Sequence, residues 1–135
     1  MRSINKHNKV KQKIMILSSG VDLIEIERLE SAIQRHGRRF LERVFTPGEL
    51  TEAGGKPASL AARFAAKEAA AKALKTGIGR VAWQEIEVRY GRSNEPILLL
   101  HGEAAAKAAE LGLTTWSVSL SHTATQAIAL VVAAG

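Results

Sequence analysis

Apolar positions near the N-terminus change from a continuous run to helical spacing. The run IMILSSGVDLI, residues 14–24, is short and interrupted only by small residues, which predicts a buried strand. After it, Ile26, Leu29 and Ile33 recur at intervals of three and four residues, which is typical of a helix with one buried face. Gly37 follows this pattern and is expected to end the helix.

The middle of the chain carries the strongest helix signals. RRFLERVF, residues 38–45, predicts a short helical piece, and TPGE, residues 46–49, matches a capping box with proline at the first helical position. This second helix should stop near AGGKP. A long alanine-rich helix is then expected from about residue 58 to 75, with Gly77 as its terminator.

The C-terminal half predicts four strands and one helix. Residues 81–91 alternate with period two and predict a half-exposed strand, and PILLLH, residues 96–101, predicts its neighbour. Residues 102–112 form a helix between glycines, and 114–122 and 125–134 form a final hairpin. The fold class expected is α+β, a single domain with a mainly antiparallel sheet and a long central helix.

The net charge of +6 is concentrated at the N-terminus. Residues 1–13 hold five basic and no acidic side chains, and without them 14 basic and 13 acidic residues remain. We expect this basic extension to be disordered and residues 14–135 to form the domain. Met15, at the beginning of the first strand-like run, is an alternative start.

Targeting signals and cysteine chemistry are both missing from the sequence. No apolar run approaches the ~20 residues of a membrane span, and the basic extension lacks the apolar core of a secretory signal. The chain has no cysteine, which excludes disulfides and thiolate chemistry. We therefore expect a cytoplasmic protein without a membrane partner.

Glu68 stands out in the long helix. If the buried stripe runs from Leu60 to Leu74, Lys67 falls inside it and Glu68 lies roughly 40–80° from its centre. A pair with Lys72, four residues on, would explain an exposed glutamate but not one at the edge of an apolar face. Glu68 is therefore a candidate for a site that supplies a cation.

Asp22, at the end of the first strand, is the second candidate carboxylate. It could cap the helix that begins near Ile24, or it could ligate a metal, and the local sequence leaves both open. If Asp22 and Glu68 meet, Mg²⁺ suits them, because Mg²⁺ takes one or two protein carboxylates together with substrate phosphates and water. Lys67 and Lys72 would then lie where phosphate oxygens need neutralising.

His122 and the stretch TGIGR, residues 76–80, each have a structural and a functional interpretation. His122 shares a strand face with Val118 and Leu120, so it is either a hydrogen-bonded core histidine or, with Ser121 beside it, the edge of a polar pocket. TGIGR has the glycines of a helix end and turn.

Residues 28–43 are rich in arginine, and Glu30 and Glu42 are the only acids after Arg28. A charge run is usually a solvated helix face, but this imbalance indicates an anionic partner. Aromatic residues make up only 4% of the chain and no nucleic-acid motif is found, so an acidic protein is a better partner than nucleic acid.

Five motifs together resemble a known family. GVDLIEIERLE, RVFTPGEL, AARFAAKEAAAKAL, TGIGR and SLSHTATQAIALV occur in the order found in the holo-[acyl-carrier-protein] synthases, the small bacterial 4′-phosphopantetheinyl transferases. The resemblance covers about residues 15–133. It implies the 4′-phosphopantetheinyl transferase fold and a Mg²⁺-dependent transfer of 4′-phosphopantetheine from coenzyme A to a serine of apo acyl carrier protein. Adenosine 3′,5′-bisphosphate would be released, in support of fatty acid biosynthesis.

The resemblance also implies roles for individual residues. Asp22 and Glu68 match the metal ligands, and Lys72 matches the lysine that contacts the α-phosphate and assists the leaving phosphate. The expected cofactor-binding residues are Arg63, Lys67, Gly77, Gly79 and His122, of which Lys67 comes from the helix pattern alone. The expected carrier-binding residues are Arg28, Arg35, Arg38, Arg39 and Arg43.

Two further points qualify the resemblance. Small members of the family are homotrimers with sites at the subunit interfaces. By this resemblance, His122 would reach into a site whose metal ligands belong to a neighbouring chain. Ser18 stands where the family commonly has glycine, which matters only if that position requires a positive φ. The rival hypothesis is a non-catalytic basic module, supported by the +6 charge, whose binding to polyanions would depend steeply on salt.

Overall fold

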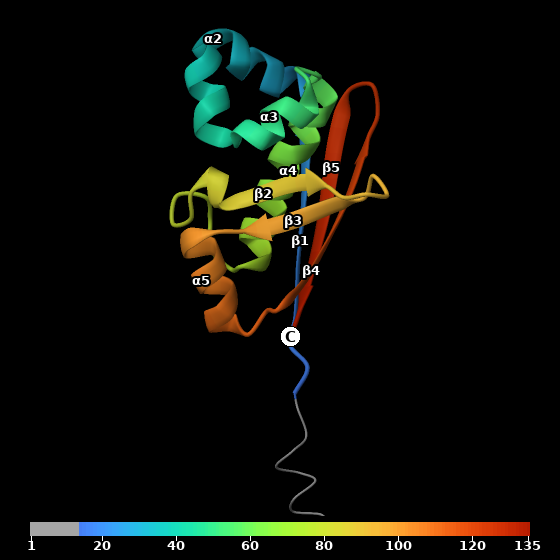
Figure 1. Cartoon of the computed structure of the whole chain (residues 1–135). Helices are drawn as coiled ribbons and strands as arrows, with labels where there is room; N and C mark the ends of the chain where they lie inside the picture. Colours follow the sequence, from blue (N-terminus) through green and yellow to red (C-terminus); the bar gives the residue numbers. More distant parts are fainter. Residues whose placement is uncertain (1–13) are drawn as a thin grey trace, which may run out of the picture.

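Helix α4 (Pro57–Ala73) packs against a three-stranded antiparallel sheet with strand order β1-β5-β4, and a second sheet of β2 and β3 also contacts it (Figure 1). The computed structural model describes residues 14–135, so the disorder predicted for residues 1–13 lies outside the described residues. The elements in chain order are β1 (Leu17–Glu25), α2 (Ile26–Val44), α3 (Pro47–Ala53), α4, the 3₁₀ turn η1 (Trp83–Glu85), β2 (Ile86–Tyr90), β3 (Pro96–Leu100), α5 (Gly102–Leu111), β4 (Thr115–His122) and β5 (Gln126–Ala134).

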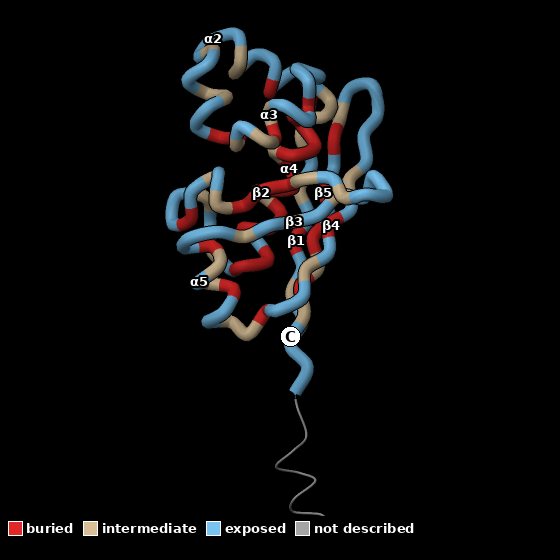
Figure 2. The backbone as a smooth tube through the Cα atoms, viewed as in Figure 1, coloured by how far each residue is buried: buried red, intermediate tan, exposed pale blue. Residues whose placement is uncertain are grey.

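The predicted α+β class with mainly antiparallel strands is confirmed, and the strands divide into two sheets. The core lies on both sides of α4, where alanines fill most buried positions of the helix (Figure 2). Small side chains on a helix let neighbouring backbones approach closely, which matters for the site described below. No helix in residues 14–135 is long and apolar enough to cross a membrane.

Strand β1 is half-exposed, so the prediction of a buried strand over residues 14–24 is wrong. Its burial alternates along the chain, with Val21 49% and Leu23 56% exposed. The apolar outer face continues onto β5, where Ile128 and Leu130 are 40% and 46% exposed. The sheet therefore covers α4 with one face and leaves its other, apolar face open.

One helix end agrees with the sequence-based expectation and one differs. Gly37 leaves helical geometry, with φ 59° and ψ −138°, so the predicted end at this residue is confirmed, and a second helical piece follows it within α2 up to Val44. Helix α4 ends before Gly77, because Lys75 adopts a left-handed φ of 59°. The N–H groups of Lys75 and Thr76 donate to the carbonyls of Lys72 and Ala71, which is a Schellman end closed by a lysine instead of a glycine.

The capping box at residues 46–49 is confirmed, since the Thr46 hydroxyl accepts from the Glu49 N–H and the Glu49 carboxylate accepts from the Thr46 N–H. The strand predicted over residues 81–91 is shorter than expected. Trp83–Glu85 form the 3₁₀ turn η1, and the strand begins only at Ile86. This turn forms part of the wall of the candidate site.

Candidate active site

Asp22, Glu68 and Lys72 come together where β1 crosses α4. The Lys72 Nζ lies 3.2 Å from Asp22 Oδ1 and donates to the Val21 carbonyl at 2.9 Å. The negative charge of Asp22 and the positive charge of Lys72 both act on Glu68. Residues 46 positions apart in sequence thus form one charged cluster, which meets the condition that the sequence left open for the two carboxylates.

The structure decides two of the alternatives left open by the sequence. Asp22 lies within strand β1, and Glu25 occupies the N-cap position of α2 without a side-chain capping bond, so the helix-cap interpretation of Asp22 is wrong. Lys72 forms its ion pair with Asp22, on the neighbouring strand. The ion pair therefore joins strand β1 to helix α4 and does not lie along one helix face.

The surroundings of Glu68 disfavour its charged form. Burial raises the pKa of this carboxyl above its ordinary value, the nearby Asp22 carboxylate raises it further, and Lys72 offsets part of the effect. Two carboxylates close together with too little positive charge form a set that a divalent cation would neutralise.

The donor set fits a magnesium ion bound jointly by protein and substrate. Within residues 14–135 no group of three or more His, Cys, Asp or Glu side chains is arranged to hold a metal, so Asp22 and Glu68 would bind an ion without a third such ligand. Mg²⁺ typically accepts one or two carboxylates and completes its octahedron with water and phosphate oxygens. The pair therefore suits Mg²⁺ better than a metal that needs a full protein cage.

The backbone of Gly20 brings the two carboxylate-bearing elements together. A Cβ at this position would overlap the carbonyl of Ala69, with its carbon only 2.9 Å away. Ser18, where the related family commonly has glycine, is accommodated without positive φ, and its hydroxyl donates to the Ala73 carbonyl at 2.6 Å. The departure from the family pattern at Ser18 therefore leaves the β1–α4 contact intact.

A hollow of about 690 Å³ opens beside Glu68. Gly79, with φ 120°, lines it as expected from the TGIGR motif, whereas Gly77 does not. Arg43, Arg80 and Trp83 line the same hollow. Its charged and aromatic lining consists of two guanidinium groups, the Trp83 ring and the three carboxylates of Glu68, Glu85 and Glu103. The guanidinium groups and the ring suit the phosphates and the planar part of a ligand, and the carboxylates favour a cation beside it.

Arg63 and Lys67 do not fit their predicted place in a cofactor site. Both side chains are fully buried in the chain. Arg63 donates to the Val88 carbonyl, to Ser59 and to Glu52. The three protons of the Lys67 ammonium go to partners inside the protein, as described further below. The sequence placed Lys67 correctly inside the buried stripe, but its partner there is not a phosphate.

His122 is exposed at the end of β4, where its Nδ1 lies 3.2 Å from the Thr123 carbonyl oxygen. The interpretation as a core histidine is therefore wrong. His122 is not among the residues that line the hollow beside Glu68. If His122 binds coenzyme A, as predicted, it must do so at a site other than the hollow beside Glu68 of its own chain.

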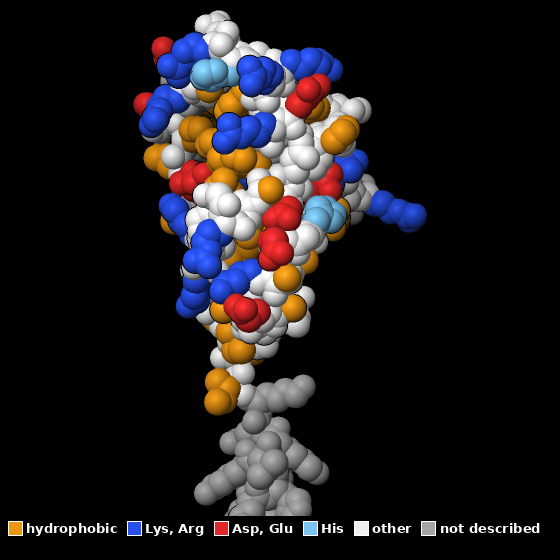
Figure 3. Space-filling model, turned by 90° about the vertical axis from the view of Figure 1, so that its left-hand side faces the viewer, with side chains coloured by type: hydrophobic (Ala, Val, Ile, Leu, Met, Phe, Trp, Pro, Cys, Tyr) orange, Lys and Arg blue, Asp and Glu red, His pale blue; other side chains and the backbone are white. Residues whose placement is uncertain are grey.

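The arginines of α2 divide into smaller groups. Arg35, Arg39 and Arg43 line one groove together with His36 and Phe40, and Figure 3 shows basic side chains gathered over this end of the molecule with apolar atoms between them. Arg28 lies nearer the start of the helix, beside a second groove that Arg35 also lines. Arg38 forms an exposed pair with Glu42.

Arg80 and Trp83 are site residues that the sequence analysis did not single out. Arg80 is the last residue of the quoted TGIGR motif, so the motif carried a signal for it. Trp83 stacks on Phe64 with ring centroids 4.7 Å apart, and Phe64 stacks in turn on Phe40 at 6.4 Å. This aromatic row extends from the hollow beside Glu68 to the arginine groove, and Arg43 lines both cavities.

Comparison with known proteins places these features in a family context. The profile of the 4′-phosphopantetheinyl transferase superfamily matches residues 18–131. A holo-[acyl-carrier-protein] synthase of Herpetosiphon aurantiacus is 53% identical over 127 residues, covering 89% of this chain and all of that protein. The corresponding protein of Solibacter usitatus is 44% identical, with 87% and 98% covered.

The similar solved structures are also holo-[acyl-carrier-protein] synthases. The crystal structure of Helicobacter pylori holo-[acyl-carrier-protein] synthase in complex with coenzyme A matches with a TM-score of 0.78 and 36% identity, covering 85% of this chain and 98% of that one. A Bacillus anthracis synthase in complex with coenzyme A (3′,5′-ADP) matches with a TM-score of 0.74 and 35% identity, with 90% and 99% covered.

Proposed function

Since this chain belongs to the 4′-phosphopantetheinyl transferase superfamily, we propose that it transfers the 4′-phosphopantetheine moiety of coenzyme A to a serine of apo acyl carrier protein. The products would be holo acyl carrier protein and adenosine 3′,5′-bisphosphate. The observation that carries the proposal is the cluster of Asp22, Glu68 and Lys72 at the crossing of β1 and α4.

Magnesium is the metal that we propose for this cluster, with Asp22 and Glu68 as its protein ligands. The ion would supply charge neutralisation at the pyrophosphate of coenzyme A. Phosphoryl-type transfer depends mainly on positioning and on stabilising charge, which two carboxylates on rigid elements and a nearby ammonium group can provide.

Lys72 and Glu68 have distinct parts in the proposed reaction. The Lys72 ammonium, held by the Val21 carbonyl and Asp22, would stabilise negative charge on the phosphate that departs with the bisphosphate. The attacking serine must lose its proton. We propose Glu68 as the acceptor, because its carboxylate lies in the same cluster as Asp22 and Lys72.

The hollow beside Glu68 is the proposed coenzyme A site within the chain. Arg43 and Arg80 offer guanidinium groups to its phosphates, and Gly79 lets the ligand approach the backbone. We propose His122 as a contact supplied to this site by a neighbouring subunit, since it does not line the hollow of its own chain.

A homotrimer with sites at subunit interfaces is the assembly that we propose. The open apolar face of the β1-β5-β4 sheet supports an oligomer, because an exposed apolar patch on this scale typically marks an interface. The number of subunits comes from the family resemblance.

Apo acyl carrier protein would dock on the arginine-rich surface of α2. Arg28, Arg35, Arg38, Arg39 and Arg43 carry five positive charges on one helix, and the groove of Arg35, Arg39 and Arg43 adds the apolar Phe40 between them. Such a surface suits an acidic helical partner, in which charge steers the encounter and apolar contacts hold the complex. We place the reaction in fatty acid biosynthesis and in the cytoplasm.

Mass spectrometry of apo acyl carrier protein incubated with the full chain, coenzyme A and Mg²⁺ tests the proposal. We expect a mass gain of one phosphopantetheine arm, which is lost when EDTA is added. No gain with several apo carriers would overturn the proposed activity and favour the basic binding module. A gain that persists in EDTA would retain the transferase but refute the metal site.

A further inference from the structure

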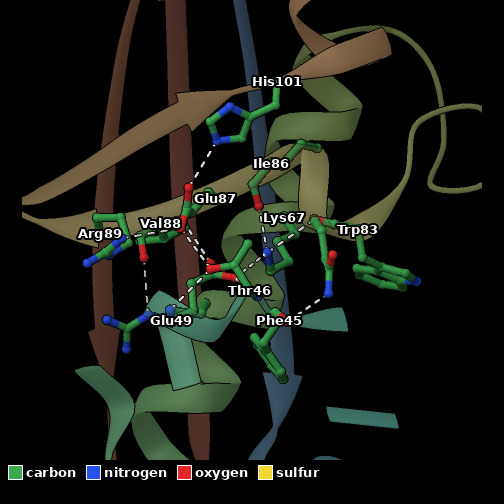
Figure 4. A network of polar contacts seen from close by, with 12 residues as sticks. Phe45, Thr46, Glu49, Lys67, Trp83, Ile86, Glu87, Val88, Arg89 and His101 are labelled. Carbon is green, nitrogen blue, oxygen red and sulfur yellow. Dashed lines mark hydrogen bonds and ion pairs between the residues drawn. The ribbon is translucent and has the colours of Figure 1, made fainter. Parts of the chain in front are cut away.

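A buried ion pair joins α4 to α3 through Lys67, the residue that precedes Glu68. The Lys67 Nζ lies 2.8 Å from Glu49 Oε1, and both side chains are fully buried (Figure 4). The same ammonium donates to the carbonyls of Trp83 at 3.1 Å and Ile86 at 2.6 Å. All three protons of the lysine are therefore used inside the protein.

Glu49 is equally committed. Its Oε1 accepts from the Thr46 N–H at 2.9 Å as well as from Lys67, and its Oε2 accepts from the Val88 N–H at 2.8 Å. One carboxylate thus connects the start of α3, the middle of α4 and strand β2. The proposed chemistry of Asp22 and Lys72 uses neither member of this pair.

The partners of Lys67 lie at the two ends of a wall of the hollow. Trp83 begins the turn η1 and Ile86 follows it, and Trp83 and Glu85 line the hollow that Glu68 faces. Lys67 immediately precedes Glu68 in α4. The ammonium therefore connects the helix that carries Glu68 to the Trp83–Glu85 segment, which lines the same hollow.

This arrangement is expensive for a purely structural role. A buried ion pair costs desolvation energy, and well-packed apolar residues of similar volume are often as stable or more so. Burial is also the largest influence on Lys67 and lowers the pKa of its ammonium, although Glu49 counteracts this. What an apolar pair could not do is bind two specific carbonyl groups of the wall.

We propose that Lys67 and Glu49 are positioning residues that hold the Trp83–Glu85 wall at a fixed distance from Glu68, so that the hollow keeps the shape that coenzyme A requires. They act through the wall and touch neither substrate nor metal. The inference rests on the proposed function for its ligand, whereas the link between the pair and the wall rests on the geometry alone.

The test uses Trp83 as a reporter. Trp83 and Trp116 are the only tryptophans, so a Trp116→Phe parent makes Trp83 the single fluorophore. In this parent, Lys67→Met leaves Glu49 buried without its cation, and Lys67→Met with Glu49→Gln removes both charges. We expect the single variant to be clearly destabilised and the double variant to recover most of the loss.

The double variant separates positioning from stability. We expect acrylamide to quench Trp83 about twofold more strongly than in the parent, and the KM for coenzyme A to rise about tenfold while the KM for the carrier protein stays unchanged. Arg63→Met is the matched control, because Arg63 is also buried and ion-paired on α4 but contacts Glu52, Ser59 and the Val88 carbonyl. It should lose stability without changing the quenching of Trp83.

Three results would overturn the inference: a double variant whose Trp83 is quenched like the parent's, an unchanged KM for coenzyme A despite an exposed Trp83, or equal quenching changes in the Arg63 control. If the parent itself shows no transfer, the proposed function fails. Trp83 quenching in the stable double variant then decides alone whether the pair holds the wall.

Discussion

The carbonyl of Ala69 leaves no room for a side chain on Gly20, so β1 and α4 meet backbone to backbone at this point. Gly20 lies two residues before Asp22, and Ala69 directly follows Glu68. The closeness of the two carboxylates therefore depends on a position that carries no side chain at all.

Gly20→Ala should separate the strand from the helix. The new methyl group would overlap backbone atoms of Ala69, which cannot rotate away, so we expect a loss of at least about 3 kcal/mol in the free energy of unfolding. Transfer activity should fall further than stability explains, because Asp22 moves away from Glu68. Urea unfolding measures the loss of stability, and initial transfer rates, corrected for the fraction of folded protein, measure the loss of activity. Ser19→Ala, at the exposed neighbouring position, is the control and should change neither.

Lys72→Met tests the role of the ammonium beside Asp22. Lys72 is 55% exposed, so its loss should leave the fold intact. If it stabilises charge that develops on the leaving phosphate, kcat should fall by about 10²–10³. The KM for carrier protein should stay the same. Steady-state kinetics decide, and a variant that retains full kcat would refute this role.

Glu68→Gln should raise stability while it removes activity. Because the folded protein raises the pKa of Glu68, ionisation of this carboxyl near neutral pH opposes folding, and an uncharged amide relieves the burial and the repulsion by Asp22. We expect a higher Tm in EDTA and at least about 100-fold lower transfer with Mg²⁺. Glu110→Gln is the control of opposite sign, because the hydrogen bond from Lys107 lowers the pKa of Glu110. A lower Tm for Glu68→Gln would contradict the electrostatic argument.

Reversal of charge on α2 tests the carrier surface. Arg28→Glu combined with Arg39→Glu should raise the KM for acyl carrier protein by about tenfold, since two favourable surface interactions become repulsive. The KM for coenzyme A should not change. Arg92→Glu, on the exposed turn between β2 and β3, alters the net charge equally per residue and serves as the control. Equal loss for both substrates would argue against docking on α2.

Local signals in the sequence predicted local structure well. The capping box at residues 46–49 formed as expected, because all its bonds lie within four residues. The position of Glu68 beside the buried stripe predicts a site that supplies a cation, and this stays a prediction. The resemblance to a family supplied Asp22 and Lys72 as its partners.

Long-range relationships explain the failures. The sequence around Lys67 does not indicate its partners, which are Glu49, 18 residues away, and the carbonyl groups of Trp83 and Ile86. The sequence therefore predicts that this lysine binds a phosphate, although it is buried and ion-paired inside the protein. The strand predicted at residues 14–24 is apolar on both faces. The hydrophobic pattern does not tell which face packs against the rest of the chain and which stays exposed. The outer face of β1 and β5 stays open, and periodicity alone could not reveal it.

Glu87 makes the fold sensitive to acid. Its carboxylate accepts from the Thr46 hydroxyl at 2.7 Å and pairs with His101 Nε2 at 2.9 Å, and Arg89 lies 3.4 Å away (Figure 4). Burial on its own would raise the pKa of Glu87. The hydrogen bonds from Thr46 and His101 and the charge of Arg89 outweigh burial, so the pKa of Glu87 is lowered from its ordinary value.

The sign of the pH dependence follows from this shift. As the pH falls through the ordinary pKa of a glutamate, the unfolded chain takes up a proton at Glu87 before the folded chain does. The stabilisation is therefore present above that ordinary pKa and is lost as the pH drops through the lower, folded pKa. Glu87→Gln should cost about 1–3 kcal/mol at pH 7, because it weakens bonds to a mostly buried carboxylate. Urea unfolding of both proteins from pH 7 to acid should show this difference shrinking as the pH falls through the ordinary pKa of a glutamate and toward the lower, folded pKa. A difference that stays constant to acid would mean that the charge of Glu87 contributes nothing to the fold.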